Sequence, residues 1–241
     1  MTFRIDTHPV RRQKLYEQIV DHLESMMLSG DLAIGDRLPS ERKLMEIFQV
    51  GRPSVREALF ALQRKELVSL RNGEQACVTR PSARGMIGNL SGVVRHMLLQ
   101  PEGTREFQQA RMILEVSLAR HAARHATDED IRDLAEALDR NGAAIGQSSE
   151  FVKTDVAFHF VIACSARNSI FRALHEAVSD WLAEQRQIST RHKKAERAAF
   201  EAHQKIFAAI KTHDADAAEQ AMQFHLEEVA EFYWSSKISQ P

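Results

Sequence analysis

The sequence predicts a mainly α-helical protein with two parts: three helices that end in a β-hairpin, followed by an all-helical bundle. Apolar residues recur at three- and four-residue spacing through most of the chain, which is the pattern of amphipathic helices. The Asn72-Gly73 pair lies between two short alternating runs, which indicates a hairpin. No strand pattern follows Pro81-Ser82, so we place the domain boundary there, with residues 1–81 before it and 82–241 after it.

The composition is that of an ordinary globular protein. Of the 241 residues, 44% are hydrophobic and 27% are charged, with 10 Gly and 6 Pro, which excludes the disordered and collagen-like classes. No apolar run approaches the ~20 residues of a membrane helix, and the first residues lack the pattern of a secretory signal. Two cysteines, Cys77 and Cys164, cannot form a disulfide framework or a four-thiolate zinc site. We therefore expect a cytoplasmic protein without a membrane partner.

The first eighty residues carry the patterns of three helices. The first, over 13–29, ends at Gly30, and Ser40 is placed to cap the second. Pro53 lies at the start of the third helix, where its missing N–H costs nothing, and that helix continues to about Lys65. Only a short turn separates the second helix from the third, so the pair forms a helix-turn-helix arrangement.

Three polar residues, Arg52, Ser54 and Arg56, lie at the exposed N-terminal end of the third helix. In a helix-turn-helix this end faces base edges in the major groove, and the planar fork of arginine can meet guanine O6 and N7 together. Arg42, on the preceding helix, is placed to touch phosphate. The window 42–65 holds six basic and two acidic residues, a local charge asymmetry that suggests two different jobs in one chain. The alternative is that these arginines form only a solvated face.

The run over 67–78 alternates apolar and polar residues on both sides of the Asn-Gly pair. A hairpin directly after a helix-turn-helix is a wing, and a wing can reach the minor groove or the DNA backbone. Arg71 and Asn72 lie at the predicted tip. In the alternative interpretation, the hairpin only covers the core of its domain.

The motifs LPSER (38–42) and RPSVREAL (52–59), within the segment 37–78, resemble the winged helix of the GntR repressor family. The resemblance implies that DNA is contacted by Arg42, Arg52, Ser54 and Arg56. It further implies that Gly73 lets the wing approach the duplex closely. The expected assembly is a symmetric homodimer on a palindromic double-stranded operator.

The second part is predicted to be a helical bundle whose centre can hold a ligand. Helical patterns cover seven segments: 84–99, 105–125, 128–146, 149–166, 168–188, 195–212 and 214–234. Capping residues mark several of the breaks, among them Thr127 with Asp130, and Asn168. The segment 141–149 is compatible with either helix or loop.

Four residues of this part suggest a metal site. Asp155 and His159 are four residues apart and therefore project from one helical face. His203 and His225 lie among apolar residues on two later helices. One carboxylate and three imidazoles suit Zn²⁺ or a similar ion and leave positions for water or a ligand oxygen. The chain has 11 histidines, so such a pair also arises by chance, and spacing alone leaves the site open.

Residues 84–234 resemble the FCD effector domain of the FadR-like branch of the GntR family. That resemblance implies a bound divalent metal, Zn²⁺ with Ni²⁺ or Mn²⁺ as alternatives, held by Asp155, His159, His203 and His225. Other histidines match no ligand position and are expected to be surface or capping residues: His121, His125, His175, His192 and His213.

The segments GRPSVREAL, IGNLSG and HATDEDIRDLAEAL resemble the sialic-acid-responsive repressors of the NanR type. This implies a ligand-responsive repressor of sugar-acid catabolism genes, with a small carboxylate effector such as N-acetylneuraminate that completes the coordination of the metal. Arg111 faces inward on its predicted helix and can pair with an anionic effector. It can equally form an ion pair with Glu115 or Asp155.

Two alternative functions remain at this stage. One is a regulator, repressor or activator, that responds to another acid such as a hexuronate, gluconate or lactate. The other is a metalloenzyme, although the chain contains no HExxH motif, no glycine-rich phosphate loop and no nucleophile elbow. Metal-assisted catalysis also needs a general acid or base beside the open coordination position, and no such group is evident.

Overall fold

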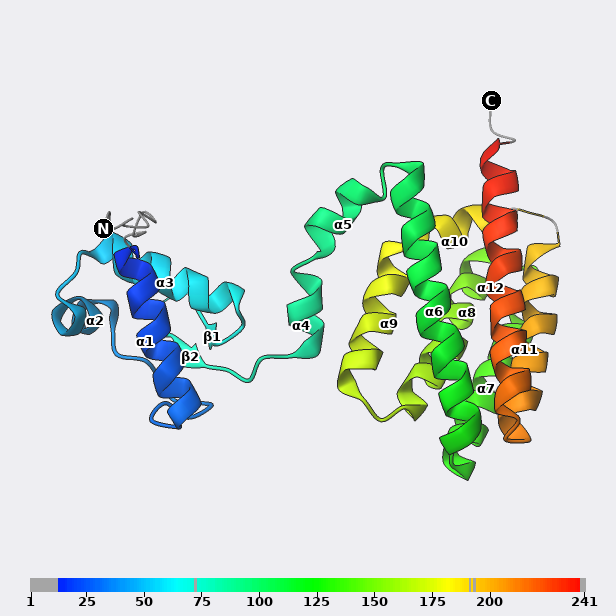
Figure 1. Cartoon of the computed structure of the whole chain (residues 1–241), viewed down its shortest axis with the longest axis horizontal. Coiled ribbons are helices and arrows are strands. Elements are labelled where there is room, and N and C mark those ends of the chain that lie inside the picture. The colour runs from blue at the N-terminus through cyan, green and yellow to red at the C-terminus, as the bar shows by residue number, and fades with distance from the viewer. Residues whose placement is uncertain (1–12, 72, 191, 193, 239–241) are drawn as a thin grey trace, which may run out of the picture. The chain divides into compact units, whose positions relative to one another are not determined.

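The computed structural model describes residues 13–71, 73–190, 192 and 194–238. The chain divides into two compact units, residues 1–86 and 87–241, and both are dominated by helices (Figure 1). The division falls within α4 (Ala83–Gly88), a few residues beyond the linker at 81–82. The mainly α class predicted from the sequence is therefore confirmed.

The first unit contains α1 (Leu15–Ser29), α2 (Glu41–Phe48) and α3 (Arg52–Arg64). Gly30 ends α1 with φ +87°, a backbone conformation that glycine adopts without steric cost. The Ser40 hydroxyl accepts the Lys43 N–H at the start of α2. Side chains from all three helices form one buried core: Ile19, Val20, Leu23, Leu44, Val55, Leu59 and Leu62. Burial of these faces leaves the N-terminal end of α3 exposed.

The wing differs in detail from the predicted hairpin. Its strands β1 (Val68–Ser69) and β2 (Cys77–Val78) are two residues long and antiparallel, with Val68 opposite Val78. Beyond the strands, the Glu74 N–H donates to the Arg71 carbonyl and Gly73 has φ +80°, while strand pairing ends at Ser69 and Cys77. The other edge of β2 bonds to the segment 36–38, which holds the strand between two partners.

The second unit is an all-helical bundle. Its helices after α4 are α5 (Ser91–Met97), α6 (Pro101–His125), α7 (Asp128–Ala143), α8 (Ser148–Ser165), α9 (Ser169–Trp181), α10 (Ala183–Ser189), α11 (Ala195–Lys211) and α12 (Ala215–Ile238). Two segments expected as single helices, 84–99 and 168–188, are each broken in two, at residues 89–90 and at Leu182. The first break follows Gly88, and glycine is a poor helix former. The segment 141–149, whose sequence is compatible with either helix or loop, contains the end of α7 and a turn.

The predicted helix starts in this unit are confirmed at two caps. Thr127 and Asp130 form a reciprocal capping box before α7, in which the Thr127 N–H donates to Asp130 Oδ2 at 2.7 Å. The Asn168 side chain accepts the Ile170 N–H at the start of α9. Both caps satisfy backbone donors that have no partner within the helix.

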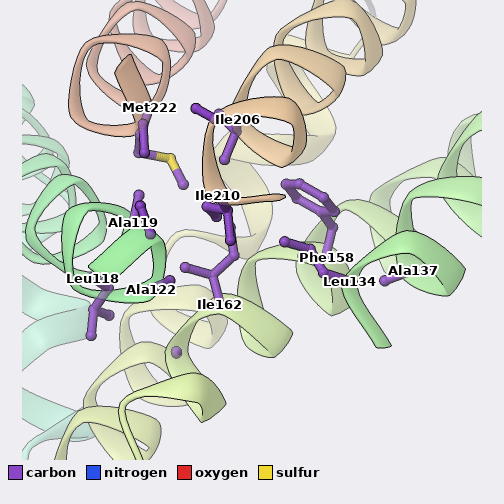
Figure 2. Packing of buried hydrophobic residues seen from close by; sticks show 14 of the residues in the cluster. Leu118, Ala119, Ala122, Leu134, Ala137, Phe158, Ile162, Ile206, Ile210 and Met222 are labelled. Atoms are coloured by element: carbon purple, nitrogen blue, oxygen red, sulfur yellow. The ribbon is translucent and has the colours of Figure 1, made fainter. Parts of the chain in front are cut away.

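The main core of the second unit lies between α6, α7, α8, α11 and α12. Figure 2 shows side chains of these helices pointing toward one another, among them Leu118, Leu134, Phe158, Ile206 and Met222. The Phe158 ring stacks on the ring of His203, with centroids 4.4 Å apart. The core therefore fixes the helices that carry the predicted metal ligands. Within the part of the chain that the structure describes, no helix is both long enough and apolar enough to cross a membrane.

Candidate DNA-binding face and metal centre

Most residues predicted to contact DNA line one groove of the first unit. Arg42 from α2, Arg52 and Arg56 from α3, and Arg71 and Gly73 from the wing all belong to its walls. Ser54 is half-buried at the start of α3 and does not line the groove. The prediction for Asn72 falls on a residue outside those the structure describes.

Glu41 is the groove residue that sequence reasoning missed. The Arg52 Nε donates to Glu41 Oε2 at 2.9 Å, and Arg56 Nε lies 3.6 Å from Glu41 Oε1. One carboxylate thus holds two guanidinium groups side by side at the N-terminal end of α3. The two arginine side chains are largely exposed and that of Glu41 is 33% exposed, and ion pairs at the surface are worth only about 1 kcal/mol or less. Both arginines can therefore exchange this partner for phosphate or a base edge.

The structure brings the four predicted metal ligands together in the second unit. Asp155 and His159 come from α8, His203 from α11 and His225 from α12, with one ligand atom of each within 4.8 Å of the others. The Nε2 atom of His203 lies 3.2 Å from that of His159 and 3.3 Å from that of His225. Its distance to Asp155 Oδ1 is 3.4 Å. All three imidazoles are fully buried.

Two buried residues orient these imidazoles. Asn141 on α7 faces His203, with its Oδ1 2.9 Å from Nδ1, and its own amide donates to Thr154 Oγ1. Glu115 on α6 faces His159, with Oε2 2.5 Å from Nδ1. An acceptor at Nδ1 places the ring proton there and leaves Nε2 with a free lone pair. Sequence reasoning missed Asn141 and considered Glu115 only as a partner of Arg111, although a polar side chain at an inward position of an amphipathic helix is a signal.

The donor set fits a divalent cation. With protons on Nδ1, the Nε2 atoms of His159 and His203 are both acceptors and cannot hydrogen bond to each other at 3.2 Å. A cation between them satisfies both lone pairs. Metal–nitrogen bonds of about 2.0–2.1 Å, at angles from about 90° to the tetrahedral angle, separate two ligand nitrogens by about 2.9–3.3 Å, a range that includes the observed spacing. The site can therefore accept a metal of the kind that binds imidazole and carboxylate.

Two buried arginines lie beside Asp155. Arg111 on α6 donates from Nε to Glu115 Oε1 at 2.7 Å, which is one of the two ion pairs considered for it from the sequence. Arg186 on α10 was not predicted; its Nε lies 3.4 Å from Asp155 Oδ2 and it donates from Nη1 to the Ser179 carbonyl. Burial, together with the charge of Arg111, lowers the pKa of Arg186 to about 10, so it stays cationic at neutral pH.

Comparison with known proteins assigns a family to each unit. The family model "Bacterial regulatory proteins, gntR family" matches residues 15–78, and the FCD domain model matches residues 106–228. The chain belongs to the GntR family. Its relatives include the HTH-type transcriptional repressor NanR of Escherichia coli K12, 45% identical over 226 residues, which cover 93% of this chain and 86% of the relative. The NanR of Klebsiella aerogenes is 45% identical over a region that covers 92% of this chain and 86% of the relative.

Solved structures agree with this fold. Streptococcus agalactiae GntR superposes with a TM-score of 0.60 at 22% identity, over 90% of this chain and 99% of the other. E. coli McbR/YncC superposes with a TM-score of 0.53 at 17% identity, over 94% of this chain and 100% of the other. The two family models and the NanR relatives identify this member of the GntR family as a ligand-responsive, DNA-binding transcriptional regulator. Because its relatives are transcriptional repressors, the metalloenzyme interpretation is set aside.

The environment keeps His203 and His225, two of the candidate metal ligands of this GntR regulator, neutral. Burial lowers the pKa of His203 to about 3 and that of His225 well below its ordinary value. Burial alone would raise the pKa of Asp155, but His159, His203 and Arg186 lower it below its ordinary value. Neutral imidazole and ionised carboxylate are the forms that bind a metal, so no proton has to be displaced from these groups at neutral pH.

The expectation for His175 is wrong. This residue of α9 is 1% exposed, and neither ring nitrogen has a hydrogen-bond partner within the described part of the chain. Its Nε2 lies 3.9 Å from Glu115 Oε1. Burial lowers the pKa of His175 to about 4. The helix packing around Glu115 encloses it, which its local sequence does not reveal.

We expect the free energy of unfolding to fall as the pH is lowered from 6.5 toward 4. In this window His175 is neutral in the folded chain and protonated in the unfolded chain, so the unfolded state binds more protons. One such histidine contributes a slope of about 1.4 kcal/mol per pH unit. Urea unfolding with a chelator present measures the slope. His175→Leu should flatten it by that amount, whereas His125→Gln, at an exposed position, should not; equal slopes in all three proteins would contradict the assignment.

Proposed function

We propose that this GntR regulator is a metal-dependent repressor of sugar-acid, specifically sialic acid, catabolism genes, and that a small carboxylate such as N-acetylneuraminate releases it from its operator. The observation that carries the proposal is the convergence of Asp155 and three imidazoles beside two buried arginines. The resemblance to sialic-acid-responsive repressors and the 45% identity to NanR repressors support the choice of effector.

The charges around the site favour an anionic ligand. Arg111 and Arg186 balance Glu115 and Asp155, so a divalent cation held by Asp155 and the three imidazoles leaves a net positive charge in a buried place. Zn²⁺ fits the donor set, with Ni²⁺ and Mn²⁺ as alternatives. A cation held by Asp155 and the three imidazoles would act as a Lewis acid that attracts a carboxylate oxygen. The arginines orient that carboxylate through charge-assisted hydrogen bonds.

Effector entry requires the walls around the arginines to move. Two hollows adjoin Arg111 and Arg186, with cavity volumes of about 30 and 20 Å³. These volumes suit one or two water molecules and are too small for a sugar acid. Both hollows are walled by α10, with Gln185 at one and Ser189 at the other, and by Val229 of α12. An effector therefore favours a state in which these walls separate, and it must bind that state more tightly to shift the population.

On DNA, we infer a homodimer that places two copies of α3 in successive major grooves, ~34 Å apart, on a palindromic operator in the cytoplasm. Arg52, Ser54 and Arg56 face base edges and Arg42 faces phosphate. The wing, through Arg71, Asn72 and Gly73, follows the minor groove or backbone. Effector binding favours a state whose two winged helices no longer match the spacing of the operator.

Thermal unfolding with a panel of acids tests the effector and the metal together. N-acetylneuraminate, a hexuronate, gluconate and lactate are added separately to Zn²⁺-loaded and to chelator-treated full-length protein. A ligand at 100 times its Kd stabilises the folded state by about 2.7 kcal/mol. We expect N-acetylneuraminate to raise Tm in the loaded protein only. If only another acid raised Tm, that acid would take the place of N-acetylneuraminate as the proposed effector. An equal rise in Tm after chelation would contradict the role of the metal.

A further inference from the structure

One buried carboxylate joins the metal site to the arginine beside it. Glu115 uses its two oxygens on different partners: Oε1 accepts from Arg111 Nε at 2.7 Å, and Oε2 lies 2.5 Å from His159 Nδ1. The residue is 2% exposed. The nearby His175 approaches Oε1 to 3.9 Å. Glu115 therefore contacts side chains of α6, α8 and α9 from one inward position of α6.

Pairing with Arg111 alone does not account for this arrangement. A buried carboxylate is costly unless its charge is compensated and its oxygens accept hydrogen bonds. Arg111, one helical turn away, compensates the charge through a single oxygen. The second oxygen is directed at the ring nitrogen of His159 that faces away from the metal site. Burial would raise the pKa of Glu115, but Arg111 and His159 lower it well below its ordinary value, so the carboxylate is ionised.

We propose that Glu115 is a positioning residue that couples metal binding to anion binding. It holds the Nδ1 proton of His159 and so directs the Nε2 lone pair toward the cation, while it fixes the guanidinium of Arg111 beside the hollow. Since the Glu115 carboxylate serves both groups, a stronger hydrogen bond from His159 to Glu115 weakens the ion pair between Glu115 and Arg111. Arg111 is then freer to bind an anion, so each ligand raises the affinity for the other. This inference rests on the proposed function and adds the residue that links its two ligands.

The first test is the Zn²⁺ affinity of full-length Glu115→Gln, measured by competition with a chromophoric chelator. Loss of an outer partner of a metal-bound histidine typically weakens metal binding 10–100-fold, and we expect a loss of about that size. The matched control is Glu201→Gln, which removes an Arg–Glu pair of the same helical spacing at an exposed place, Arg197 with Glu201 at 3.2 Å. Glu201→Gln should bind Zn²⁺ like the wild type. Wild-type affinity in Glu115→Gln would overturn the proposal.

A second variant separates a direct loss of Zn²⁺ affinity from an indirect effect of misfolding. Glu115→Gln leaves Arg111 buried without its counter-charge, which can destabilise the chain. The double variant Arg111→Met with Glu115→Gln removes both charges and still deprives His159 of its carboxylate. It should melt cooperatively and show the same loss of Zn²⁺ affinity. A double variant that binds Zn²⁺ as tightly as the wild type would also overturn the proposal, because its fold is not in question.

The coupling itself is measured by the ratio of N-acetylneuraminate affinities with and without Zn²⁺. We expect this ratio to fall at least several-fold in Glu115→Gln, a change that a loss of general stability does not produce. An unchanged ratio would refute coupling through Glu115. Failure of the proposed function has a different signature, because the wild type would then show no Zn²⁺-dependent response to any acid in the panel.

Discussion

The His203→Ala variant should remain bound to operator DNA in the presence of the acid effector, whereas the wild type should be released. His203 is the most central of the four ligands, since its Nε2 lies within 3.4 Å of the other two imidazoles and of Asp155. The binding free energy of a structural zinc site is ~10–16 kcal/mol shared among its ligands, so loss of one should weaken Zn²⁺ binding by roughly two orders of magnitude or more.

Two measurements check this expectation. Competition with a chelator gives the metal affinity, and a gel shift over a titration of N-acetylneuraminate gives operator release. Operator binding without effector reports that the variant still folds. The control is His121→Ala, which removes an exposed imidazole of α6 that lies outside the ligand set. Release of His203→Ala at the effector concentration that releases the wild type would show that the response does not pass through this site.

The convergence of the four candidate metal ligands was predicted through the resemblance to the FCD domain, because spacing alone left the site undecided. Asp155 and His159 lie one helical turn apart on α8, and His203 and His225 lie on inward faces of their helices. The helix starts at Thr127 and Asn168, in contrast, could be predicted from the residues alone, because a cap is decided by three or four consecutive residues. These features need no knowledge of how distant segments pack.

The residues that surround the ligands could not be predicted in the same way. Arg186 lies on α10, a short helix that follows a break at Leu182, and no glycine or proline marks this break in the sequence. Asn141 and Glu115 gain their roles from the imidazoles they face across the bundle, 62 and 44 residues away in the sequence. His175 appears unremarkable in sequence and is enclosed only by tertiary packing. The register of the wing is set by the segment 36–38, which pairs with β2 from far outside the hairpin.

The Arg56→Ala variant should lose operator affinity by roughly 10–100-fold. Arg56 and Arg52 are held side by side by Glu41 at the exposed start of α3, within the groove that the wing also lines. An arginine that contacts guanine in two places is worth about 1–3 kcal/mol of discrimination. Because that contact depends on sequence, the loss should be large on operator DNA and small on unrelated DNA. The same argument applies to Arg52→Ala.

Arg42→Ala provides the contrast that separates base contact from simple attraction to DNA. Arg42 is 88% exposed on α2 and its partner Glu46 lies 3.5 Å away on the surface. A phosphate contact should weaken binding to operator and unrelated DNA alike and reduce the slope of log affinity against log salt by about 1. Binding isotherms at several salt concentrations, on both DNAs, measure these effects, with Arg197→Ala in the second unit as the control. If Arg56→Ala and Arg42→Ala changed the two affinities in equal proportion, α3 would bind DNA through charge alone and sequence selection would have to come from the wing.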